Sequence, residues 1–165
     1  MKTPELEIII AEHFGIRQNL IVPNVSWGWG LNYEADLVVV TRSRCAYEVE
    51  LKVSKSDLRA DLKKKHHHDG AMFKGLWFAM PESVYDSELV PDQAGVLLVK
   101  TETVKNWKNE VETHKYVHVE KKPEVTRTKI SEKKYMKLLE LAAMRVWTQK
   151  KAMLKQKLIT QTEWI

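Results

Sequence analysis

The chain has 165 residues, of which 44% are hydrophobic and 30% are charged, and this composition is typical of a globular protein rather than of a disordered chain. No apolar run approaches the length of a membrane span, the first residues lack the apolar run of a secretory signal, and the single cysteine leaves no partner for a disulfide within the chain. We therefore expect one cytoplasmic domain over residues 1–165 with no membrane partner, and the net charge of +5 is compatible with a polyanionic ligand.

Residues 4–14 are predicted to form the first helix. Thr3 suits the N-cap and Pro4 suits the first helical position. Apolar residues recur along this segment at helical spacing, which predicts one buried face. Gly15 follows the pattern and is expected to end the helix.

A short apolar strand is expected within residues 19–25, and two tryptophans follow it between glycines, at Trp27 and Trp29. Indole rings in such a loop could stack on unpaired bases, and Trp29 is the candidate for this role. The alternative is that one or both indoles cap the hydrophobic core. The residues favour the core for one of the two and leave the other open.

Two strands are expected at residues 33–40 and 46–53, joined by a short turn that favours antiparallel pairing. The second strand alternates polar and apolar residues, so that Glu48, Glu50 and Lys52 share one face. Asp36 near the start of the first strand can then converge with Glu50. Two acids and a lysine in one small site are the parts of a Mg²⁺-dependent hydrolytic centre, whereas a solvent-facing sheet edge is the plainer alternative.

The next helix is expected to run from Ser54, which begins a capping box with Asp57, to about residue 65. Lys55, Arg59 and Lys63 fall at intervals of four and predict a basic ridge that could follow a phosphate backbone. A solvated helix face is the alternative.

Three histidines at residues 66–68 follow this helix. Consecutive side chains on a helix point in different directions, so all three cannot bind one metal ion. We expect them to complement the helix C-terminus, with His67 as a candidate contact to DNA phosphate.

Apolar strands at residues 75–80 and 94–99, joined by a short helix, predict a crossover and therefore a partly parallel sheet. Residues 1–100 thus form an α/β core of the order αβββαβ, with a mixed central sheet flanked by helices. Residues 101–165 add an edge strand at 116–119 and a long C-terminal helix from Ser131. The apolar stripe of this helix either covers the sheet or pairs with a second copy of the chain as a homodimer.

The pattern of Asp36 followed by Glu50-Leu51-Lys52 resembles the PD-(D/E)XK nuclease superfamily, in which an Asp precedes a hairpin and Glu-x-Lys lies on the next strand. Residues 49–61 are similar to the MmcB-like DNA-repair nucleases, where an E-x-K-x-S strand enters a helix with a D-x-x-x-D pattern. The resemblance covers residues 1–100. It departs from the superfamily pattern at Ala35, where a proline is usual.

The resemblance implies a restriction-endonuclease-like fold and a deoxyribonuclease that depends on Mg²⁺ (or Mn²⁺). Asp36, Glu50 and the carbonyl of Leu51 would hold the metal, and Lys52 would orient the attacking water and stabilise charge on the phosphorane. In the superfamily an acid of the first helix often joins this site. The candidates, in order of preference, are Glu5, Glu7 and Glu12, and the alternative is that all three are solvated.

The expected function is therefore metal-dependent hydrolysis of DNA, in repair or in a phage or mobile-element setting. A non-catalytic nucleic-acid-binding module of the same fold is the second hypothesis. An interaction protein assembled through its C-terminal helix is the third.

Overall fold

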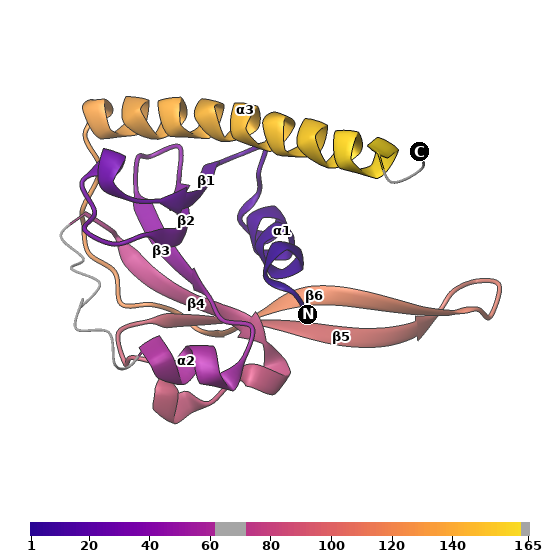
Figure 1. Ribbon diagram of the computed structural model, residues 1–165. Helices are drawn as coiled ribbons and strands as arrows, with labels where there is room; N and C mark the ends of the chain where they lie inside the picture. The colour runs from indigo at the N-terminus through magenta and orange to yellow at the C-terminus, as the bar shows by residue number, and fades with distance from the viewer. Residues whose placement is uncertain (62–71, 163–165) are drawn as a thin grey trace.

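The computed structural model describes residues 1–61 and 72–162 and confirms the predicted α/β fold. Its centre is a six-stranded sheet whose strands lie side by side in sequence order (Figure 1). The strands are β1 (Leu20–Val25), β2 (Ala35–Val40), β3 (Ala46–Leu51), β4 (Gly75–Pro81), β5 (Gly95–Lys105) and β6 (Val111–Lys121). The helices are α1 (Thr3–Phe14), α2 (Lys55–Asp61) and α3 (Glu132–Thr162).

The sheet changes from antiparallel to parallel pairing at β3. Strands β1, β2 and β3 pair antiparallel, with Val38 opposite Glu48. Strands β3, β4 and β5 pair in parallel, as the crossover spacing predicted, because α2 precedes β4 and two 3₁₀ turns precede β5. Strand β6 returns antiparallel to β5. The αβββαβ order expected for residues 1–100 is present, and β6 and α3 extend it.

Helix α1 covers one face of the sheet. Leu6 and Ile10 are fully buried and belong to one apolar cluster with Leu37 of β2 and Val49 of β3. These residues explain why the segment folds as a helix here, since its apolar residues recur at the spacing that one helix face requires.

The sequence predicted the C-terminal end of α1 correctly but not its N-cap. The N-cap is Lys2, without a side-chain cap, and the predicted cap Thr3 lies inside the helix. Gly15 ends the helix as predicted, at a φ of 78°, a backbone conformation that glycine adopts without steric cost.

Helix α2 and the first part of α3 cover the opposite face. Leu58 of α2 packs in a cluster with Phe78 of β4, and Leu138 of α3 packs in a cluster with Val38 of β2. All four side chains are buried. Between these two apolar clusters, β3 presents charged side chains to the same face, and this interruption of the core positions the candidate site.

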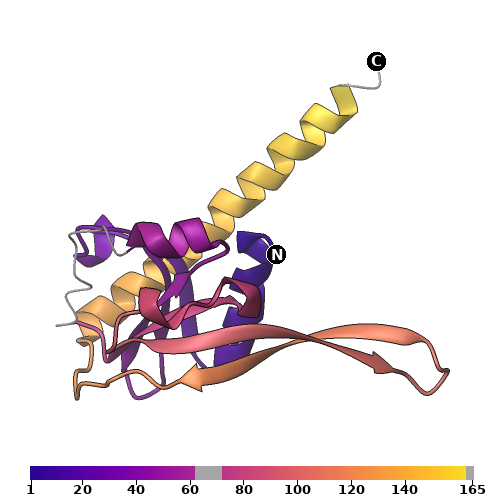
Figure 2. The ribbon, with the colours of Figure 1, turned by 90° about the horizontal axis from the view of Figure 1, so that it is seen from below.

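The hairpin of β5 and β6 extends beyond the body of the molecule (Figures 1 and 2). Each strand has 11 residues, whereas the sequence predicted only strands at 94–99 and 116–119. The outer half of the hairpin is exposed on both faces. It therefore lacks the alternation of apolar and polar residues by which a half-buried strand is recognised.

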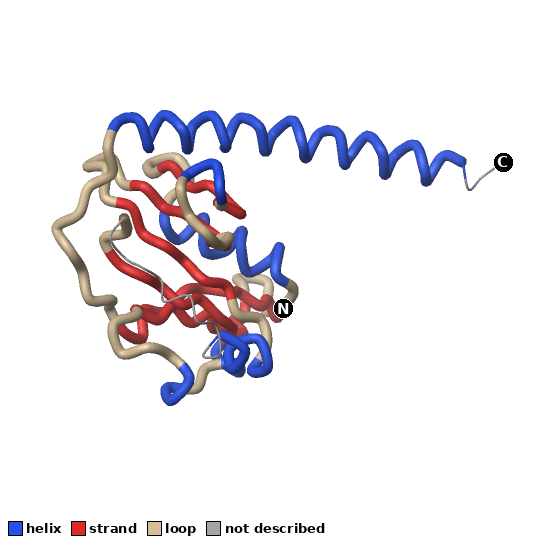
Figure 3. Tube along the Cα trace, turned by 60° about the vertical axis from the view of Figure 1, so that its left-hand side comes forward, coloured by secondary structure: helices blue, strands red, loops and turns tan. Residues whose placement is uncertain are grey.

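Helix α3 has 31 residues; its first half lies against the body and its second half extends away from it (Figure 3). Leu138 is buried, whereas Met144, Trp147 and Met153 are more than half exposed. The apolar stripe predicted for this helix thus covers the sheet over its first turns and is open to solvent further along. Within residues 1–61 and 72–162, no helix is both long and apolar enough to cross a bilayer.

Candidate active site

Strand β3 places a row of charged side chains inside the molecule. Glu48, Glu50 and Lys52, the residue after the strand, have exposed fractions of 0%, 3% and 2%. They share one face because side chains alternate along a strand, as the sequence predicted. Charged groups are costly to remove from water unless they are paired, so the partners of this row define what the site can do.

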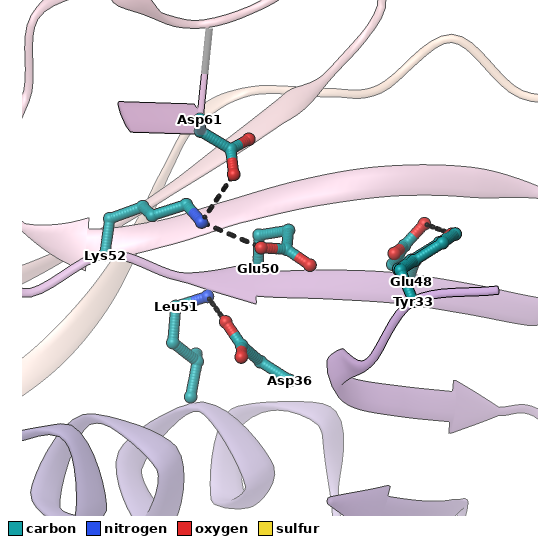
Figure 4. A network of polar contacts seen from close by, with 7 residues as sticks. All are labelled: Tyr33, Asp36, Glu48, Glu50, Leu51, Lys52 and Asp61. Carbon is teal, nitrogen blue, oxygen red and sulfur yellow. Dashed lines mark hydrogen bonds and ion pairs between the residues drawn. The ribbon is translucent and has the colours of Figure 1, made fainter. Parts of the chain in front are cut away.

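Lys52 lies between two carboxylates, one from its own strand and one from α2 (Figure 4). Its Nζ donates to Glu50 Oε2 at 2.8 Å and to Asp61 Oδ1 at 3.0 Å. Burial by itself lowers the pKa of Lys52, but the charges of Glu50 and Asp61 and their hydrogen bonds outweigh it and raise the pKa above its usual value. Lys52 is therefore a fixed cation within a buried network.

Asp36 lies at the start of β2 and is hydrogen-bonded to the end of β3. Its Oδ2 accepts a hydrogen bond from the backbone N–H of Leu51 at 2.8 Å. The antiparallel register pairs Leu37 with Val49, so the residue before Leu37 reaches the end of β3. Two strands thus bring Asp36, Glu50 and Lys52 together, which is the convergence that the sequence predicted (Figure 4).

The three candidate acids of the first helix have different surroundings. Burial raises the pKa of Glu7, and the nearby charge of Asp36 raises it further. Glu5 instead forms an ion pair with Lys115 of β6, and the hydrogen bond from Lys115 lowers the pKa of Glu5. Of the three candidates, Glu7 is affected by the charge of Asp36, Glu5 is paired with Lys115, and Glu12 is exposed.

Glu48 occupies the opposite end of the row from Lys52 (Figure 4). Tyr33 donates its hydroxyl hydrogen to Glu48 Oε2 at 3.0 Å. This contact satisfies part of the hydrogen-bonding capacity of a fully buried carboxylate. The pairing with Tyr33 gives Glu48 a structural role at the edge of the site.

The donor atoms at this site fit a hard cation that shares its coordination with substrate. Within residues 1–61 and 72–162, no group of three or more His, Cys, Asp or Glu side chains could hold a metal ion by itself. Asp36, Glu50 and the Leu51 carbonyl supply two carboxylates and a backbone oxygen. Mg²⁺ is commonly held by one or two carboxylates, with water and substrate phosphate completing its octahedron. This chemistry suits Mg²⁺ or Mn²⁺ better than a metal that needs an all-protein cage.

The residues proposed to bind nucleic acid fall into three groups. Lys55 and Arg59 are exposed on α2. Lys63 and His67 lie outside the described residues. The prediction for Trp29 as an exposed stacking residue is wrong, because its ring is 3% exposed and packs beside Phe73.

Trp29 is a core residue because α3 covers it. Its Nε1–H donates to the backbone oxygen of Lys134 at 2.9 Å, so both the apolar ring and its polar atom are satisfied. The loop glycines suggested exposure, and only the long-range contact with α3 shows burial. The sequence also left Asp61 out of the site, although the D-x-x-x-D pattern of residues 57–61 was a signal that could have included it.

Comparison with known proteins adds information on the fold. No family model matches the chain, and no curated protein matches it. A solved structure of the SPO1766 protein of unknown function from Silicibacter pomeroyi is similar, with a TM-score of 0.63 and 13% sequence identity. The match covers 95% of this chain and 94% of that one. This likeness extends over the whole fold, including the segments that follow β5.

Proposed function

We propose that this chain is a metal-dependent DNA nuclease whose active site is formed by Asp36, Glu50 and Lys52. The observation that carries the proposal is their convergence from two antiparallel strands, with Asp36 hydrogen-bonded to Leu51 and Lys52 bonded to Glu50. An acid pair with a buried lysine has the elements needed for phosphodiester hydrolysis, namely oxygen ligands for a cation and a fixed positive charge.

Lys52 supports this function as a cation rather than as a base. Its raised pKa keeps the amino group protonated at neutral pH, so it cannot accept a proton from water there. A protonated amino group can orient the attacking water and can stabilise negative charge on the phosphorane. The carboxylates of Glu50 and Asp61 hold that amino group in place before substrate arrives.

Asp36, Glu50 and the Leu51 carbonyl would hold the cation. When bound, Mg²⁺ supplies Lewis-acid activation of the scissile phosphate and of a water molecule. Glu7 adds a further acid to this proposal, because burial and, in second place, the charge of Asp36 raise its pKa. A bound cation would offset the repulsion between the two carboxylates.

DNA is the proposed substrate because the helix whose last residue bonds to Lys52 also carries exposed cations. Lys55 and Arg59 are on α2, and the last residue of α2, Asp61, bonds to Lys52. Cations at this position can contact phosphates on either side of the scissile bond without reading the base sequence.

The buried ion pairs of Lys52 favour a second candidate function. Both partners of Lys52 are buried carboxylates, as they would be in a purely structural charge network. In that case the chain is a nucleic-acid-binding module of the same fold, with no hydrolytic step.

The test is cleavage of labelled duplex, nicked, branched and single-stranded DNA with Mg²⁺, Mn²⁺ or EDTA. The nuclease proposal expects cleavage in at least one metal and none in EDTA. Binding of DNA without cleavage under every condition would support the binding module instead. Cleavage that persists in EDTA would contradict the metal-dependent mechanism.

A further inference from the structure

Two segments project from the same side of the molecule, the outer half of the β5–β6 hairpin and the distal half of α3 (Figures 1 and 2). They leave the body on either side of α1 and diverge in Figure 2. Neither belongs to the αβββαβ core, and neither contributes a residue to the acidic row on β3, which consists of Glu48, Glu50 and Lys52. Their composition therefore needs a separate explanation.

Each projection carries an exposed tryptophan with a lysine over its ring. At the hairpin tip, Trp107 is 88% exposed, and Lys108 Nζ lies 4.9 Å from its ring centroid. On α3, Trp147 is 63% exposed, and Lys150 Nζ lies 5.0 Å from its ring centroid. A single exposed apolar side chain is common on protein surfaces, but here the same tryptophan–lysine pair occurs once on each projection.

The distal half of α3 is strongly basic. The sequence from Leu141 to Thr162 contains no aspartate or glutamate, and Lys150, Lys151 and Lys155 are exposed. Arg145 is anchored to the body through a hydrogen bond to the backbone oxygen of Asn24. The remaining cations have no acid on the same part of the helix to balance them, so this surface attracts a polyanion.

The hairpin tip is the second part of this surface, and it carries less net charge than the distal half of α3. Asn106 donates to the carboxylates of Glu110 and Glu112, so these acids are used to close the turn. Trp107 and Lys108 extend beyond that network at the tip. The tip therefore suits a flat apolar ligand next to a negative charge.

A ligand that offers both flat apolar rings and regularly spaced negative charge is a nucleic acid with unpaired bases. We propose that the distal half of α3 and the hairpin tip bind single-stranded nucleic acid. Trp147 and Trp107 stack on bases, and Lys150, Lys151 and Lys155 neutralise phosphates. The inference deepens the proposed nuclease function by naming unpaired DNA as its substrate class, while the binding itself needs no metal.

The alternative partner for the exposed surface of α3 is a second copy of the chain. Exposed apolar residues on this helix recur at heptad spacing, at Leu139, Val146 and Met153. Pairing two such helices would bring exposed lysines of the same sign together, because Lys150 lies between Val146 and Met153 on that face. Charge therefore favours a polyanion over a second copy.

The first experiment measures binding of the full chain in EDTA to labelled oligothymidylate of about 30 nucleotides, which cannot pair with itself, and to a duplex of equal length. We expect tighter binding to the single strand. Trp147→Leu and Trp107→Leu should each weaken it roughly tenfold, whereas Trp147→Phe and Trp107→Phe should retain most of the affinity because phenylalanine also stacks. Equal affinity of the Leu and Phe variants, or tighter binding to duplex, would overturn the proposal.

The second experiment measures the salt dependence of the same binding. Replacing Lys150, Lys151 and Lys155 by alanine should reduce the log–log slope by about 2, since each neutralised phosphate of a single strand contributes about 0.7. The matched control replaces three exposed arginines elsewhere, Arg17, Arg42 and Arg127, and should leave the slope unchanged. Equal slopes for the two triple variants would contradict the role of α3.

Two further readouts separate this proposal from its competitor and from the nuclease proposal. Asp36→Asn should keep single-strand binding and lose cleavage. Wild type that binds the single strand but cleaves no DNA would reject only the nuclease proposal. Light scattering reports a second copy on α3. A wild-type dimer that Val146→Lys plus Met153→Lys converts to a monomer, with unchanged binding by the Leu variants, would overturn the single-strand proposal.

Discussion

The acidic row on β3 and the distal half of α3 use the same kinds of residue in opposite environments. Lys52 is 2% exposed and bonded to two carboxylates, whereas Lys150 is exposed and lies over Trp147. The tryptophans divide in the same way, with Trp29 buried under α3 and Trp147 in solvent. The position of a charge or ring in the fold, more than its identity, therefore determines whether it serves stability, chemistry or binding.

This comparison predicts that the two environments respond differently to the same substitution. A buried charge that loses its partner costs the full penalty of desolvation. An exposed lysine or tryptophan contributes little to the free energy of unfolding and affects only the ligand that it contacts.

The largest expected effect is that of Lys52→Met. It leaves Glu50 and Asp61 without their shared cation, and we expect the free energy of unfolding to fall by about 3–5 kcal/mol. The control Lys55→Met removes an exposed lysine from α2 and should change stability by less than about 0.5 kcal/mol. Urea denaturation of both variants measures the difference, and equal stability would show that the buried ion pairs are not structural.

The next effect separates the buried and exposed tryptophans. Trp29→Ala removes a ring packed against Phe73 and its bond to Lys134, so we expect a loss of about 3 kcal/mol. Trp147→Ala should change unfolding by less than about 0.5 kcal/mol. Thermal unfolding checks both, and a large loss in Trp147→Ala would mean that α3 has a folded-state partner.

A smaller effect is expected for the basic ridge on α2. Lys55→Ala combined with Arg59→Ala should reduce the salt slope of duplex DNA binding by about 2 without changing the melting temperature. The control pair, Arg17→Ala with Arg42→Ala, removes the same charge from exposed positions away from the site. Equal slopes for the two pairs would remove the ridge from the DNA-binding surface.

The smallest effect concerns the pH dependence of stability. Because the folded-state pKa of Glu7 is raised, the folded chain binds more protons than the unfolded chain between the ordinary pKa and the raised one. The free energy of unfolding therefore falls as pH rises through that window.

Glu7→Gln removes this titration. As pH rises above the ordinary carboxyl pKa, the melting temperature of the variant should fall less, or rise more, than that of wild type, by a few degrees at most. Glu12→Gln changes an exposed acid of the same helix and should follow wild type. If the two variants give the same profile, Glu7 does not lie in the environment described.

The sequence predicted those strands whose two faces differ in chemistry. β3 was recognisable because Val49 and Leu51 alternate with Glu48 and Glu50. The outer half of the hairpin offered no such contrast, since both faces meet solvent, and its length could not be predicted.

The convergence of Asp36 and Glu50 was predictable, because their strands are consecutive and a short turn joins them. The choice between Glu5 and Glu7 was not, because both flank the buried residue Leu6 and only their partners differ. Lys115 of β6 engages Glu5 and Asp36 approaches Glu7. Such contacts arise when distant segments pack, and no local pattern reports them.

The assignment of Asp36 to the active site is tested most directly by cleavage with Mg²⁺, comparing Asp36→Asn with wild type and with the exposed-acid control Asp92→Asn. Asparagine can still accept the hydrogen bond from Leu51, so the variant should fold like wild type. We expect its cleavage rate to fall on the order of 10²-fold or more, while Asp92→Asn cleaves normally. Equal cleavage by Asp36→Asn and wild type would contradict the assignment of the active site.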